Sequence, residues 1–210
     1  MIAESSLIID FCLWVSQFLY FACFIPQIVT NVRLRSASGV STALLLAFFN
    51  GYGTFYLYAY SIDLPLAYLV LPPLQGSALL VLIVQRFWYA KTEPIVWPLV
   101  GYMLNTVVLF ACIPFVIQQP AFWGGIFGWI AFVLFVINQV PQTIKVHQEK
   151  SVQGFSYGFV FIQGIAAILE TIGSIIAGLP VQTLMMALRG VLMFVVFSVQ
   201  FVLYKNNTRQ

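Results

Sequence analysis

The sequence predicts an all-α integral membrane protein with seven transmembrane helices, arranged as two parallel three-helix bundles joined by a linker helix. Three observations predict this fold. The composition is 61% hydrophobic and 7% charged, with a mean hydropathy of +0.97, whereas soluble domains carry about 25% charged residues. Seven apolar runs are long enough to cross a hydrocarbon core of about 30 Å as helices. A short phrase also recurs within the chain, which indicates an internal duplication.

The apolar runs follow one another with short connections and cover nearly the whole chain. None shows the alternating pattern of barrel strands, so we expect helices throughout and no soluble domain. In order, the runs span residues 8–32, 40–61, 64–86, 94–118, 121–146, 155–177 and 180–204.

The first three runs form the first repeat, residues 1–92. The first run follows an N-terminus that carries Glu4 and Asp10, where a signal peptide would need basic residues, so we expect a retained helix. Asp63 lies in the turn between the second and third runs, and Arg86 lies where the third run ends.

The fourth run has no partner at the repeat offset, and we expect it to be a linker helix within residues 93–119. Runs five to seven form the second repeat, residues 120–210, with a turn at Gly178 and Pro180 before the last run. Three helices end on the side opposite to their start. One extra crossing therefore lets both repeats enter from the same side, which makes them parallel and favours a ligand cavity between them.

Basic residues collect in alternate connections. By the positive-inside rule this pattern places the N-terminus outside or in a lumen and the C-terminus in the cytosol. Seven helices are required to fit this pattern, which independently supports the count. The basic residues that carry this argument are Arg33, Arg35, Arg86, Lys91, Lys145, Lys150, Lys205 and Arg209.

The repeated phrase contains a Pro-Gln pair near the end of an apolar run. Pro26 and Gln27 recur as Pro141 and Gln142, 115 residues later, and each pair is followed by a basic stretch, a serine and a Gly-x-Ser triplet. Proline inside a helix removes a hydrogen-bond donor and crowds the carbonyl four residues earlier, so both prolines are expected to be hinges. The adjacent glutamines are expected to take part in the hinges by binding a freed carbonyl.

Two such phrases in a chain of three plus one plus three helices resemble those of the PQ-loop membrane transporters, in particular the cystinosin-like members, with SWEET sugar transporters as distant relatives. The resemblance covers essentially the whole chain. It implies alternating-access transport of a small polar metabolite, with the kinked helices as hinges. Cystinosin-like members carry membrane-embedded aspartates associated with proton coupling. The corresponding positions here are Gln163 and Phe194, so the resemblance does not imply coupling by that route.

Polar residues inside the apolar runs are the candidate substrate-binding residues. Glu170 and Arg189 lie at similar depth in the membrane, on helices joined by a tight turn. Because an unpaired charge inside the membrane has a high free-energy cost, we expect the two side chains to pair. They either form a static ion pair that fixes two helices, or they bind the charged ends of an amino acid. The complete set that we predict for substrate binding is Asn50, Asn138, Gln163, Glu170 and Arg189.

The sequence therefore predicts a secondary transporter of an amino acid or related zwitterion. The alternatives are a SWEET-like sugar transporter and a membrane receptor with a fixed ligand pocket. No catalytic set, metal site or cofactor is expected, so we do not predict an enzyme. The expected partners are a small-molecule solute and the lipid bilayer, with no nucleic acid, and a homo-oligomer is left open.

The cellular compartment follows only from the loops and the tail. The single Asn-x-Thr sequon, at Asn206, falls in the expected cytosolic tail, and the connections are short. These features favour a prokaryotic inner membrane over a lysosomal membrane.

Overall fold

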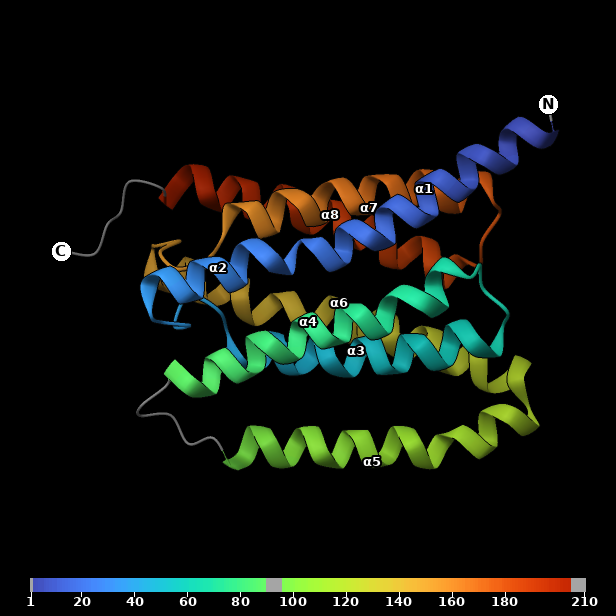
Figure 1. Ribbon diagram of the computed structural model, residues 1–210, viewed down its shortest axis with the longest axis horizontal. Coiled ribbons are helices and arrows are strands. Elements are labelled where there is room, and N and C mark those ends of the chain that lie inside the picture. Colours follow the sequence, from blue (N-terminus) through green and yellow to red (C-terminus); the bar gives the residue numbers. More distant parts are fainter. Residues whose placement is uncertain (1, 90–95, 205–210) are drawn as a thin grey trace.

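The computed structural model describes residues 2–89 and 96–204, and in these residues the regular secondary structure is entirely helical (Figure 1). The expected boundary between residues 92 and 93 lies outside the described residues, as do Lys91, Lys205 and Arg209. The helices are α1 (Ile2–Ala22), α2 (Phe24–Leu34), α3 (Thr42–Ser61), α4 (Ala67–Tyr89), α5 (Val96–Gln118), α6 (Pro120–Glu149), α7 (Tyr157–Ile176) and α8 (Val181–Tyr204).

Five helical segments are long and apolar enough, by length and composition, to cross a membrane, counted over the described residues. They are Leu7–Leu34, which combines α1 with α2, and the helices α4, α6, α7 and α8. The helix α3 has 20 residues but carries several polar side chains, of which Thr54 and Ser61 are buried. In α5 the apolar stretch found is Thr106–Gln118, which is shorter than a span. The prediction of an all-helical protein is confirmed for the described residues.

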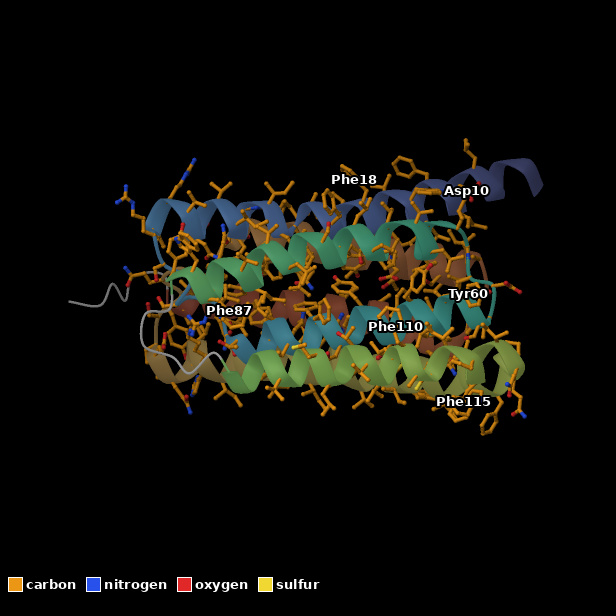
Figure 2. All side chains as sticks on the ribbon, turned by 60° about the horizontal axis from the view of Figure 1, so that its bottom comes forward. Asp10, Phe18, Tyr60, Phe87, Phe110 and Phe115 are labelled. Carbon is orange, nitrogen blue, oxygen red and sulfur yellow. The ribbon has the colours of Figure 1, made fainter. Side chains whose placement is uncertain are left out.

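The outer surface is covered by large apolar side chains. Figure 2 shows Phe18 pointing away from α1, and 56% of its surface is exposed. The repeat-related pair Trp14 and Trp129 is also on the outside, with 40% and 46% exposed. The exposed apolar surface is far larger than the apolar patches that soluble monomers expose. The chain is therefore an integral membrane protein whose outer side chains face lipid.

The helices repeat at the offset that the sequence predicts. Adding 115 to the bounds of α3 gives residues 157–176, which are the bounds of α7. The same shift carries α4 onto α8 within one residue at the start, and α1 together with α2 onto α6. We refer to α1–α4 as the first repeat and to α6–α8 as the second.

The two repeats pack against each other through related helix pairs. The most extensive contacts are those of α3 with α6 and of α1 with α7, and these pairs exchange under the 115-residue shift. At one related position Gly128 packs on the Tyr58 ring, and at the other Gly173 packs on Leu13, with the small and large partners exchanged. Within the described residues, the helix α5 contacts α3 and α6 and none of the other helices. The interface between the repeats thus has a pseudo-twofold relationship, with α5 outside it.

Basic residues gather at one end of the molecule. The end of α2, the end of α4 and the connection from α6 to α7 meet there, at the left of Figure 1. Arg33, Arg86 and Lys150 lie in these segments. Asp10 lies toward the opposite end (Figure 2), and Asp63 belongs to the connection from α3 to α4, which is at that same end in Figure 1. We call the first the basic end.

Candidate functional site

Gln27 binds the loop of the opposite repeat. Its Nε2 donates to the carbonyl of Gly154 at 2.9 Å, and its Oε1 accepts from the N–H of Ser156 at 2.7 Å. Both partners are backbone groups of the Gly-x-Ser triplet that follows the second Pro-Gln pair. The expectation that this glutamine binds a carbonyl freed in its own helix is therefore wrong, because its amide is used between the repeats.

Gln142 makes the same two bonds in the other direction. Its Nε2 donates to the carbonyl of Gly39 at 2.9 Å, and its Oε1 accepts from the N–H of Ser41 at 2.8 Å. Both glutamine side chains are buried, with at most 1% exposed. We call these four bonds the glutamine clamp. It ties each repeat to the other at the basic end.

The two loops held by the clamp touch at Gly39 and Gly154. A Cβ built on Gly39 would overlap the backbone of Gly154, and one built on Gly154 would lie 3.1 Å from the Cα of Gly39. Gly154 also has a φ of 79°, in the left-handed region that favours glycine. Any side chain at Gly39 would therefore push the two loops apart, and only glycine allows the basic end to close this tightly.

A second pair of related glutamines supports the clamp. Gln85 donates to the carbonyl of Ile28 at 3.2 Å, and Gln200 donates to the carbonyl of Thr143 at 3.0 Å. Each carbonyl belongs to the residue that directly follows a clamp glutamine. The last helix of each repeat thus fixes the backbone that carries the clamp.

The two halves differ at one position of this network. Asn31 accepts from Gln27 at 2.9 Å and donates to Gln85 at 3.0 Å, which links clamp and support in the first repeat. Its counterpart in the second repeat is Val146, which cannot form these bonds. The Oε1 of Gln200 accordingly has no hydrogen-bond partner among the described residues. The clamp is better supported in the first repeat.

The prolines that precede the clamp glutamines affect their helices differently. Pro26 lacks the N–H that would bind the carbonyl of Ala22, and the helix is interrupted at Cys23, between α1 and α2. Pro141 lies inside α6, which continues through it. The prolines thus share a position next to the clamp. Their role as hinges stays a prediction.

A layer of phenylalanine rings lies next to the clamp, on the side away from the loops. The Phe24 ring contacts the Phe48 ring at a centroid distance of 6.2 Å and the Phe159 ring at 5.7 Å. Phe24 precedes Gln27 by one helical turn, and a void of only about 10 Å³ lies between these groups. These rings separate the clamp from a cavity that Phe48 also lines.

That cavity lies between the repeats and has a volume of about 40 Å³. This is room for no more than a few water molecules. Every repeat helix except α2 contributes to its wall, and α5 does not. Its lining residues are Gln17, Tyr20, Phe48, Tyr52, Phe55, Gln75, Phe135, Gln163, Glu170, Met186 and Arg189.

The helices α1 and α7 give the cavity a polar wall around Glu170. Its carboxylate accepts from Gln17 Nε2 at 3.2 Å and from the Tyr20 hydroxyl at 2.8 Å. Gln75 in turn donates to the carbonyl of Gln17 at 3.0 Å and to its Oε1 at 3.2 Å. Gln163 completes this wall, is 6% exposed, and makes no side-chain hydrogen bond to another described residue. The wall therefore holds a fixed carboxylate beside an amide that is free to bind a ligand.

The helices α3 and α6 give the cavity an aromatic wall. Phe135 is at its centre, with ring centroids of Tyr52 at 5.5 Å, Phe55 at 6.2 Å and Phe48 at 6.4 Å. Tyr52 also stacks on Phe48 at 5.9 Å. The Phe135 ring thus joins the other three into a continuous aromatic surface.

Arg189 joins the cavity from α8, beside the aromatic wall. Its Nη1 donates to the carbonyl of Phe135 at 2.9 Å, its Nε reaches the carbonyl of Met186 at 3.4 Å, and its guanidinium carbon is 5.4 Å from the centroid of the Phe135 ring. The Nη2 group has no hydrogen-bond partner among the described residues. It is thus available to an anionic group in the cavity.

The expected ion pair between Glu170 and Arg189 is not present in the described residues. Glu170 is held by neutral donors, Gln17 and Tyr20, and Arg189 by backbone carbonyls. The prediction of a pair rests on the equal depth of the two residues in the membrane. Sequence position gives this depth, but it does not give the direction in which a side chain points. Both residues nevertheless line the same cavity, so its fixed charges balance.

The other three predicted binding residues differ in whether they line the cavity. Gln163 lines the cavity, whereas Asn50 and Asn138 do not. Asn138 is fully buried in α6, and neither its Oδ1 nor its Nδ2 has a partner among the described residues; the Oδ1 of Asn50 is also unpartnered. Ligand binding by these two asparagines stays a prediction.

Sequence reasoning missed several cavity residues. Gln17 is a polar residue in the middle of the first apolar run, so the sequence does contain a signal for it. Tyr20 and the four rings of the aromatic wall had no such signal, because the chain contains 20 Phe and 10 Tyr.

Comparison with known proteins agrees with the internal duplication. A sequence model described as the PQ loop repeat matches residues 8–68 and 123–183, which are again 115 residues apart and together make up more than half of the chain. An uncharacterized protein of Schizosaccharomyces pombe is 26% identical over 154 residues, which cover 70% of this chain and 54% of the relative. The chain thus spans about half the length of the curated relative it matches.

Proposed function

The chain belongs to the PQ-loop repeat family, and from this premise we propose that it is a secondary transporter of a small polar metabolite, an amino acid or a related zwitterion. The family supports the transporter-type function. The substrate class is our proposal and comes from the cavity.

We propose that the described helices form two three-helix bundles, the first from α1 with α2, α3 and α4 and the second from α6, α7 and α8, with α5 as a seventh, linking span. The basic end then faces the cytosol by the positive-inside rule. The matched relative is a yeast protein, so the expectation of a prokaryotic inner membrane stays a prediction and is not part of the proposal.

The observation that carries the proposal is a cavity between the repeats with one acid and one base in its wall. Glu170 and Arg189 balance each other in charge without being joined, so each is available to an opposite charge. An amino acid supplies both opposite charges, through its ammonium and its carboxylate. An ion of one sign would leave a net charge buried in the protein, which is expensive.

The clamp supports alternating access. It holds the two repeats together at the basic end, and the cavity of about 40 Å³ has no room for an amino acid in the described conformation. Opening must break bonds made by both glutamines, because each holds the loop of the other repeat. Pro26 and Pro141, directly beside these glutamines, are the points at which we propose the helices bend.

Uptake into liposomes tests the proposal. The purified protein is reconstituted and exchange of labelled amino acids, amines and sugars is measured, with thermal unfolding of the protein in the presence of each solute as a binding assay. We expect zwitterionic amino acids to exchange. Exchange of a sugar alone would support the SWEET-like alternative and overturn the proposed substrate class, and stabilisation without any exchange would support a receptor.

Variants of the two charged residues refine this test. Glu170→Gln and Arg189→Gln should each abolish exchange, and the double variant should fold but not bind zwitterions. Asp63→Asn removes a charge outside the cavity and is the matched control. Retained exchange in the double variant would show that the two charges have a structural role only.

A further inference from the structure

The lining of the cavity does not follow the 115-residue repeat, because related positions carry different kinds of side chain. These differences bear on the part of a substrate that the charged groups do not bind. Gln163 and Glu170 are the counterparts, 115 residues later, of Phe48 and Phe55, and all four line the cavity. The helix α7 therefore presents polar groups at the two positions where its counterpart α3 presents rings.

The helices that face α3 and α7 differ from each other in the same way. Tyr20, on α1, places its hydroxyl on Glu170, whereas its counterpart Phe135, on α6, has no hydroxyl and packs against Phe55. Related positions of the two repeats thus form a polar wall on α1 and α7 and an aromatic wall on α3 and α6. A substrate that is polar all round would place polar groups against the rings.

From these observations we infer that the substrate is a zwitterionic amino acid with a bulky apolar or aromatic side chain, rather than a cationic or small one. This inference rests on the proposed function. The ammonium lies at Glu170 and the carboxylate at Arg189, and the side chain lies against Phe48, Tyr52 and Phe55. Burial of apolar surface against these rings then provides the selectivity.

A cationic side chain is disfavoured at the same rings, although aromatic faces can bind cations. The guanidinium of Arg189 already lies over the Phe135 ring, at 5.4 Å from its centroid. A second positive charge beside it would be repelled. Among the lining residues Glu170 is the one carboxylate, and it is needed for the ammonium.

A ligand series on the unaltered protein tests the inference by thermal shift and by isothermal titration. We expect L-phenylalanine and L-leucine to bind about tenfold or more tightly than L-alanine and L-lysine, since each buried methylene adds to the discrimination. Phenethylamine, which lacks the carboxylate, should bind more weakly than L-phenylalanine. Tighter binding of L-lysine or L-alanine, or equal binding of phenethylamine, would overturn the inference and leave a transporter of amino acids or amines. Binding of no amino acid would overturn the proposed function itself.

Variants assign the selectivity to the aromatic wall. Phe55→Ala should weaken L-phenylalanine binding about tenfold more than it weakens L-alanine binding. Phe127→Ala removes a buried ring from α6 that does not line the cavity, and it should leave the ratio of the two affinities unchanged. Phe55→Leu keeps an apolar side chain and serves if the alanine variant does not fold; it should lower the preference for L-phenylalanine over L-leucine. An unchanged affinity ratio in both Phe55 variants would overturn the inference.

Discussion

Gln27 and Gln142 occupy the same position in the two repeats, and each binds the backbone of the loop that follows the other. The bond lengths nearly match, at 2.9 and 2.7 Å for Gln27 and 2.9 and 2.8 Å for Gln142. Neither repeat closes its own loop. Closure of the basic end is therefore a property of the two repeats together, and the following predictions test it.

Replacement of Gln27 by Leu should open the basic end. It leaves the Gly154 carbonyl and the Ser156 N–H without partners, so the free energy of unfolding should fall by about 1–3 kcal/mol. Labelling of Cys23 by a maleimide should become faster in a background without Cys12 and Cys112. The control, Gln118→Leu, changes an exposed amide at the opposite end. Equal labelling of Cys23 in both variants would argue against a clamp.

Replacement of Gly39 by Ala should prevent the two loops from meeting. The added methyl overlaps the backbone of Gly154, which cannot rotate away as a side chain can, so the closed conformation should lose about 1–3 kcal/mol of stability. Gly76→Ala is the matched control, because a Cβ there meets no atom within 4 Å. The melting temperature reports the difference. A Gly39 variant as stable as the control would contradict the contact.

Replacement of Pro26 or Pro141 by Ala should slow transport several-fold while equilibrium ligand binding stays unchanged, because the helix regains a backbone hydrogen bond that opening must then break. Exchange rate and affinity are measured on the same preparation. Pro114→Ala, in α5, is the control. If both hinge variants transport at the normal rate, the prolines are ordinary packing residues.

Replacement of Asn138 by Leu should stabilise the described conformation by about 1–3 kcal/mol, because both polar atoms of this buried side chain are without partners. Asn31→Leu, which breaks two hydrogen bonds, should have the opposite effect. Chemical unfolding compares the two. If Asn138 binds the ligand in another conformation, the stabilised variant should also transport more slowly. A loss of stability on removing Asn138 would show that it has a partner.

The sequence predicted the fold well where the signal was a repeat. The spacing of 115 residues between Pro26 and Pro141 also relates the bounds of α3 to those of α7. The repeat in the sequence therefore predicted that these two helices correspond. The partners of Gln27 could not be predicted in this way, since they are backbone atoms and leave no mark on residue types. The pairing of Glu170 with Arg189 failed for a related reason: depth follows from sequence position, whereas side-chain direction follows from packing, here from the hydroxyl of Tyr20 and the carbonyl of Phe135.

The reciprocal form of the clamp also bears on how such a chain can arise. A contact in which each partner gives the same group and receives the same group is the isologous contact of a symmetric dimer. Two separate copies of a single ancestral repeat could form it unchanged, with Gly39 meeting its own equivalent at the twofold axis. Gene fusion through α5, which contacts α3 and α6 among the described residues, would then add a covalent connection to an interface that already existed. After such a fusion the halves would be free to differ, as Asn31 and Val146 do at related positions.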